Sequence, residues 1–104
     1  NDVILFDAGY MVRNFDYYNK DAINNKNFSK ILLLSSTDKE EMHTSFNSAL
    51  SKLSSAQGSW LILSHNWRSE DFYKLQMDAR YNLIQEKHYK DIDIYHYSGQ
   101  QNQN

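Results

Sequence analysis

A chain of 104 residues with a net charge of −2 is long enough for one domain and lacks the basic surface typical of nucleic-acid-binding proteins. It has no cysteine, which excludes disulfides and thiolate metal sites, and no apolar run approaches the roughly 18 residues of a membrane-spanning helix. Hydrophobic residues make up 40% of the chain and charged residues 23%, as in ordinary globular domains.

The first apolar run predicts a buried strand close to the start of the chain. Residues 3–6 read VILF and are followed by Asp7 and Gly9. Continuous apolar runs of this length suit strands that are buried on both faces of a parallel sheet. Residues 10–18 place their apolar side chains on one face of a helix, and the polar residues 19–27 predict a loop.

A second apolar run and a longer helix follow. Residues 31–34 read ILLL, and from Asp38 to Ala56 the apolar residues recur at the spacing of one helix face. Thr37 and Glu40 have the spacing of a capping box, which predicts Thr37 as the N-cap. Gly58 is well placed to end this helix.

The last third of the chain predicts another strand, a helix and a final strand of a different kind. Residues 60–63 read WLIL and form the third apolar run. Residues 70–88 carry another helical stripe, with Ser69 as the expected N-cap. Residues 91–97 read DIDIYHY, and this alternation predicts a half-exposed strand at the edge of the sheet.

The predicted fold class is therefore α/β, with the element order β-α-β-α-β-α-β. We expect a small, open, mostly parallel four-stranded sheet with helices on both faces. It occupies a single domain over residues 1–99, followed by a disordered tail at 100–104. The three apolar runs should be central strands. Because the chain enters a strand without an initiator methionine or signal segment, we expect it to be a domain of a longer protein.

The polar residues that follow the predicted strands are the candidate binding site. Ligands of open α/β sheets collect outside the carboxyl ends of the strands. In the predicted parallel sheet these ends carry Asp7 and Gly9, residues 35–37, Ser64 to Asn66, and Ser98, so we expect these residues to converge on one strand-end rim. His65 would be a general base or ligand with Asp7 as its partner carboxylate. The alternative is that these residues only end the strand and cap the next helix.

Aromatic residues and one acidic pair add two further candidates. Trp67 lies just beyond the third strand, where an aromatic ring can stack on a sugar, whereas most other aromatic residues are expected to pack in the core. Asp91 and Asp93 have the spacing of an Asp-x-Asp pair that binds Mg²⁺ or Mn²⁺. The alternative for this pair is the polar face of an edge strand.

Glycine-dependent catalytic and nucleotide-binding motifs are absent from the sequence. The chain has three glycines and contains neither the G-x-S-x-G nucleophile motif nor a dinucleotide or P-loop fingerprint. We therefore expect no cofactor and no catalytic residue in this domain.

Two stretches resemble the tails of bacterial polytopic membrane proteins of the glycosyltransferase family 39 type. One is VILFDAGYMVRNFDYY, residues 3–18, which ends in an aromatic-Tyr-Tyr cluster, and the other is WLILSHNW, residues 60–67. The family consists of mannosyltransferase-like proteins of cell-surface polysaccharide synthesis. The resemblance implies a lipid-linked sugar donor, an extracytoplasmic tail and a catalytic aspartate in the membrane-embedded part, so no catalytic residue is carried over to this chain.

Two functional hypotheses follow from the sequence. The first is a non-catalytic extracytoplasmic accessory domain of a membrane glycosyltransferase, in which Asp7, His65, Asn66 and Trp67 help to position a sugar. Its partners would be the membrane-embedded remainder of the chain and a lipid-linked sugar or acceptor glycan. The second is a cytoplasmic α/β domain, either hydrolase-like or a regulatory domain that binds a protein partner.

Overall fold

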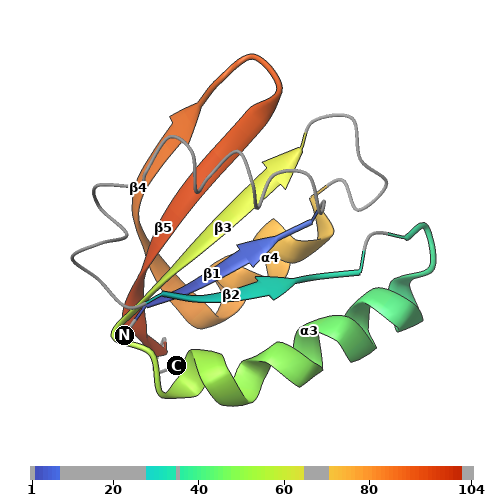
Figure 1. The fold of residues 1–104 in the computed structure, drawn as a ribbon, viewed down its shortest axis with the longest axis horizontal. Coiled ribbons are helices and arrows are strands. Elements are labelled where there is room, and N and C mark those ends of the chain that lie inside the picture. The colour runs from blue at the N-terminus through green and yellow to red at the C-terminus, as the bar shows by residue number, and fades with distance from the viewer. Residues whose placement is uncertain (1, 8–27, 35, 65–70, 102–104) are drawn as a thin grey trace.

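The computed structural model describes residues 2–7, 28–34, 36–64 and 71–101 (Figure 1). The helix expected at 10–18 and the expected N-cap Ser69 lie outside these residues. The described elements are, in chain order, β1 (Asp2–Phe6), β2 (Phe28–Leu32), α3 (Lys39–Ser54), β3 (Gly58–Ser64), α4 (Phe72–Arg80), β4 (Tyr81–His88) and β5 (Ile92–Gln101).

All five described strands belong to one mixed sheet with the order β2-β1-β3-β5-β4. β1 pairs in parallel with β2 on one side and with β3 on the other. β5 pairs antiparallel with both β3 and β4. Figure 1 shows the carboxyl ends of β1 and β3 and the turn between β4 and β5 at the same end of the sheet.

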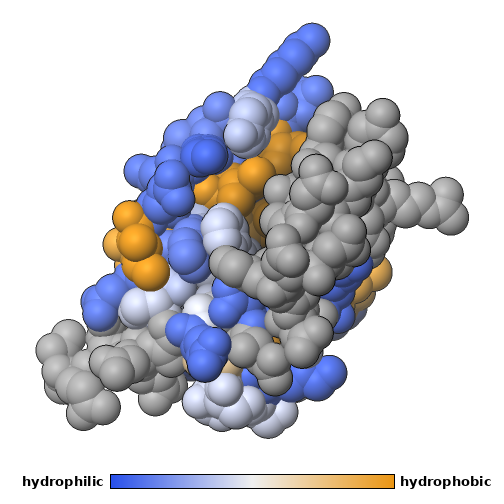
Figure 2. All heavy atoms as spheres, turned by 60° about the vertical axis from the view of Figure 1, so that its left-hand side comes forward, coloured by the Kyte–Doolittle hydropathy of each residue, from blue (hydrophilic) through white to orange (hydrophobic). Residues whose placement is uncertain are grey.

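The expected mostly parallel four-stranded sheet with helices on both faces is wrong. The helix predicted over 70–88 ends at Arg80, and residues 81–88 form a fifth strand instead. This strand forms because β5 offers it an antiparallel partner, which a helical pattern along the chain cannot reveal. After the buried Tyr81, every residue of β4 is exposed. Figure 2 brings this side of the molecule forward and shows hydrophobic patches among hydrophilic residues.

The expected positions of two strands in the sheet are also wrong. β2 was expected at the centre but is an outer strand, and Leu32 and Leu34 are 57% and 44% exposed. β5 was expected at an edge but lies between β3 and β4. Its sequence alternates because its two faces differ in burial. Tyr95 and Tyr97 are buried on one face, whereas Ile92, Ile94 and His96 are half-buried on the other. β5 also extends to Gln101, into the expected tail.

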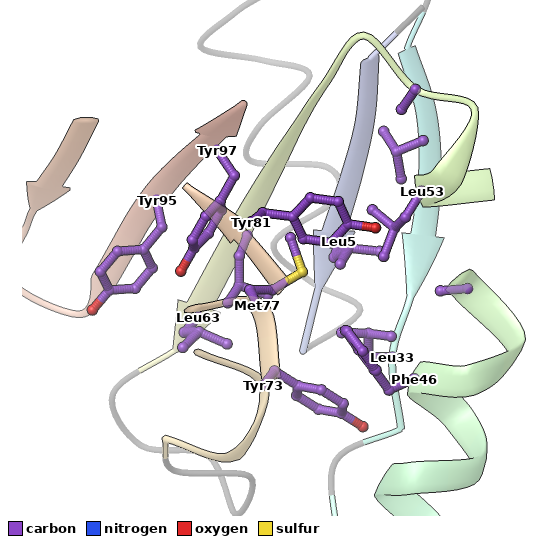
Figure 3. Packing of buried hydrophobic residues seen from close by; sticks show 14 of the residues in the cluster. Leu5, Leu33, Phe46, Leu53, Leu63, Tyr73, Met77, Tyr81, Tyr95 and Tyr97 are labelled. Atoms are coloured by element: carbon purple, nitrogen blue, oxygen red, sulfur yellow. The ribbon is translucent and has the colours of Figure 1, made fainter. Parts of the chain in front are cut away.

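The main core lies between the sheet and the two described helices. Side chains of β1, β3 and β5 point towards those of α3 and α4 in Figure 3. The buried residues of this core are Val3, Leu5, Leu33, Met42, Phe46, Ala49, Leu53, Ala56, Leu61, Leu63, Tyr73, Met77, Tyr81, Tyr95 and Tyr97. Both described helices therefore cover the same face of the sheet.

A smaller group of buried residues lies on the other face. Ile4, Phe6 and Ile62 are almost completely buried, and half-buried Trp60 and Ile94 pack against them. Alternate residues of β1 and β3 thus point to opposite faces, and both faces are apolar. This double burial explains why these strands read as continuous apolar runs.

The predicted helix over residues 38–56 is confirmed as α3, but its two ends differ from the prediction: its N-cap is another residue, and it ends at Ser54, whereas Gly58 is the first residue of β3. α3 buries Met42 and Phe46 towards the sheet, as its periodicity predicts. Its N-cap is Asp38, not Thr37, since Asp38 Oδ1 accepts a hydrogen bond of 2.9 Å from the Glu40 N–H. The N–H that donates this bond is two residues after Asp38. The Asp38 carboxylate lies at the N-terminal end of the helix, where its negative charge also interacts favourably with the helix dipole.

Candidate functional site

β1 and β3 end side by side, at the edge of the sheet where the sequence predicted the strand-end rim. They pair in parallel, and Phe6 lies opposite Ile62. Asp7 follows β1 and is only 1% exposed. Its Oδ1 accepts a hydrogen bond of 3.0 Å from the backbone N–H of Ser64, and its own N–H donates to the Ile62 carbonyl. The Asp7 side chain therefore joins the ends of the two strands.

The end of β2 is fixed to both helices at the same edge. The Tyr73 hydroxyl, from α4, donates a hydrogen bond to the Leu34 carbonyl. The Leu34 N–H donates in turn to Ser45 Oγ, from α3, over 2.8 Å. We refer to Asp7, Leu34, Ser45, Ser64 and Tyr73 as the carboxyl-end cluster. Its hydrogen bonds join the ends of β1 and β3 to each other and the chain after β2 to both helices.

The environment of Tyr73 keeps its hydroxyl protonated. Burial raises the pKa of Tyr73 above its ordinary value of 10.0, and the negative charge of Asp7 raises it further. A hydrogen bond with Ser45 opposes these two effects. At neutral pH the Tyr73 hydroxyl is therefore a hydrogen-bond donor.

The structure describes one of the four residues predicted to position a sugar. Asp7 lies at the expected edge of the sheet, whereas His65, Asn66 and Trp67 lie outside the described residues. The expected place of Ser98 on the rim is wrong, because β5 runs antiparallel to β3 and Ser98 pairs with Gly58 at the start of that strand. Sequence reasoning did not identify Ser45 or Tyr73 as members of this cluster. Tyr73 was expected to pack in the core, which it does, but its hydroxyl reaches the end of β2 from there.

The weaker metal candidate, Asp91 and Asp93, lies near the turn between β4 and β5. Asp93 Oδ1 is 2.7 Å from His88 Nδ1, and Asp91 is exposed in the turn. Among the described residues no group of three or more His, Cys, Asp or Glu side chains is arranged to hold a metal ion. Asp93 thus contacts a histidine side chain.

Trp60 is the tryptophan whose surroundings the structure describes. Its ring stacks on His96, with the ring centres 3.9 Å apart and the planes 8° apart. Its Nε1 donates a hydrogen bond of 3.3 Å to Asp2 Oδ2. One face of the Trp60 ring is thus covered by an imidazole, which leaves that face unavailable for stacking on a sugar.

Comparison with known proteins identifies no relative: no family model, no curated protein and no solved structure matches this chain. Within the described residues, no helix is long and apolar enough to cross a membrane.

Proposed function

We propose that this chain is a non-catalytic accessory domain of a polytopic membrane glycosyltransferase that acts in cell-surface glycan synthesis. In this proposal it lies on the extracytoplasmic face of the membrane and helps to position a sugar substrate. Its partners are the membrane-embedded remainder of the chain and a lipid-linked sugar or acceptor glycan. The proposal starts from the resemblance carried by residues 3–18 and 60–67.

The observation that carries the proposal is the hydrogen bond between Asp7 and Ser64. The two stretches that carry the resemblance include β1 and β3, which are neighbours in the sheet. The Asp7 carboxylate holds the end of one against the end of the other. His65, Asn66 and Trp67 follow Ser64 directly in the sequence. A pre-formed edge of this kind supports ligand binding because less ordering is needed when the ligand arrives.

The chemistry of the proposed contacts suits a neutral polyhydroxyl ligand. Amide and imidazole groups exchange hydrogen bonds with sugar hydroxyls, and an indole ring covers the apolar face of the sugar. We assign these roles to Asn66, His65 and Trp67. The role of the buried Asp7 is to hold the end of β1 against Ser64, the residue that precedes these three. The chemical step would belong to the membrane-embedded remainder of the protein.

An NMR titration of the chain with mono- and disaccharides tests the proposal. We expect amide shifts at Asp7, Ser64 and the three residues after Ser64 at millimolar sugar, and a weaker response in Trp67→Ala. The matched control is Trp60→Phe, at the tryptophan stacked on His96, which should leave the shifts unchanged. No response at millimolar sugar would contradict the proposal. Hydrolytic turnover by the chain that is lost in His65→Ala would favour the hydrolase-like alternative.

A further inference from the structure

His88 lies between two carboxylates at the turn end of the β4–β5 hairpin. Its Nδ1 is 2.7 Å from Asp93 Oδ1, across the strand pair, and its Nε2 is 3.4 Å from Glu86 Oε2 on its own strand. Asp93 is the register partner of His88. We refer to Glu86, His88 and Asp93 as the hairpin cluster.

The protonation state of the imidazole decides how many of these contacts are favourable. A neutral imidazole has one N–H and can donate to one of the two carboxylates, while its other nitrogen presents a lone pair. The imidazolium has two N–H groups, so it can donate to Asp93 and Glu86 together and offset their mutual repulsion. Protonation therefore tightens the contact between β4 and β5.

The other groups around His88 do not compete for this role. The Tyr95 ring, on β5, meets His88 edge to face at 5.8 Å. Burial, with the negative charges of Asp93 and Glu86, raises the pKa of Tyr95 to about 12, so Tyr95 stays neutral while His88 titrates. Lys74 of α4 lies over that ring, with its Nζ 5.0 Å from the ring centre, and pairs with Asp78 at 2.6 Å. In the described part of the chain, further charged residues near His88 are Lys87 on the same strand, Asp71 before α4, and Lys90 and Asp91 in the turn.

His88 lies on a strand that is attached to the sheet through β5 alone, by backbone pairing and by the Tyr89 N–H, which donates a hydrogen bond of 2.8 Å to the Ile92 carbonyl at the turn. β4 is an outer strand, and its residues from Asn82 to His88 are exposed. A hairpin end with little buried surface opens locally at a small cost in free energy. Even the modest energy of an exposed ion pair is then large enough to change the open population. Since Leu63 is paired with Asp93, this end of the hairpin lies beside the end of β3.

We propose that His88 is a pH-sensitive clamp, which closes the turn end of the β4–β5 hairpin when protonated and releases it when neutral. The direction of this pH dependence follows from the contacts of the His88 ring with Asp93 and Glu86. The hydrogen bond with Asp93 is the main reason that the pKa of His88 is raised above its ordinary value of 6.5. The stabilisation is therefore complete below about pH 6.5 and is lost as the pH rises through the raised value. This inference does not depend on sugar binding.

The test measures opening of the hairpin in the unmodified chain by NMR relaxation dispersion, at about pH 5.5 and about pH 8. We expect the open fraction of residues 86–93 to rise about two- to fivefold at the higher pH, the range that an exposed ion pair supports. The midpoint should coincide with the titration of the His88 ring. In Asp93→Asn, both the ring titration and the opening should move to lower pH.

Two further variants separate the clamp from a general effect of pH. His88→Gln should abolish the pH step in hairpin opening. His43→Gln is the matched control, since His43 is exposed on α3, against Phe72, and this change should leave the step intact. The clamp is refuted if the open fraction is equal at both pH values while the His88 ring titrates, or if the step survives in His88→Gln.

Discussion

At the scale of single residues, the buried side chains of Asp7 and Ser59 show that burial alone does not define a structural role. Asp7 is 1% exposed, and its carboxylate accepts the Ser64 N–H. Ser59 is 2% exposed, yet its hydroxyl makes no hydrogen bond within the described part of the chain. A buried polar group stabilises a fold when it is hydrogen-bonded and costs free energy when it is not.

The two residues should therefore respond differently to replacement by alanine. Asp7→Ala leaves the buried Ser64 N–H without its acceptor, so we expect the free energy of unfolding to fall by about 1–3 kcal/mol. Ser59→Ala removes a hydroxyl that makes no such bond, so stability should be unchanged or higher. Urea denaturation of both variants checks this. An equal loss in both would show that burial, and not the bond to Ser64, decides the cost.

Only part of the carboxyl-end cluster could be predicted from the sequence. Asp7 could be identified because it follows an apolar run directly, and strand ends of parallel sheets gather at one edge. Ser45 and Tyr73 reach that edge through the packing of α3 and α4 on the sheet, which no local pattern encodes. Sequence alone gives the residues that end a strand, but not those that reach it from another element.

At the scale of elements, the structure shows which of two adjacent residues caps α3, a choice that the sequence alone does not decide. Thr37 has capping-box spacing to Glu40, but Asp38 is the residue whose side chain caps the helix. Asp38 itself is held by the Ser36 hydroxyl, which accepts its N–H over 2.9 Å. Both candidates are good N-cap residue types, so the choice depends on the backbone path into the helix.

This assignment predicts that Asp38→Ala is the more damaging change. It removes the acceptor for the Glu40 N–H and a negative charge from the positive end of the helix, at an expected cost of about 0.5–2 kcal/mol. Thr37→Ala, at an exposed position, should change stability by less than about 0.5 kcal/mol. Thermal denaturation of the two variants makes the comparison. A larger loss in Thr37→Ala would restore the capping box.

The change from α4 to β4 marks the limit of local prediction. Residues 81–88 contain leucine, glutamine, glutamate and lysine, which favour helices, and no glycine or proline separates them from α4. They form a strand because β5 lies antiparallel to them. The partner strand comes later in the chain, so a nearest-neighbour pattern cannot include it, and tertiary pairing overrides the local preference.

At the scale of the whole molecule, the sheet order assigns different environments to runs that look alike in sequence. The runs at 3–6, 31–34 and 60–63 are all apolar, but only the first and third belong to central strands. β2 has a neighbour on one side, and Leu32 is exposed. The apolar runs at 3–6 and 60–63 thus located β1 and β3, whereas β2 spans Phe28–Leu32 and includes only half of the run at 31–34. The order of the strands depends on crossovers that such runs do not encode.

Hydrogen exchange across the sheet follows from this order and is the broadest test of the fold. Amides of β1 and β3, such as those of Leu5 and Leu61, should exchange most slowly, since both strands are paired on both sides and buried. Amides of β2 should exchange faster. The amides of residues 82–88, in the exposed outer strand, should be the fastest of the sheet, because opening them exposes little apolar surface. The Cα chemical shifts of residues 82–88 provide the control, and helical values there would restore the long helix and remove the fifth strand. Extended values together with slow exchange would instead show that β4 opens only when the whole sheet unfolds.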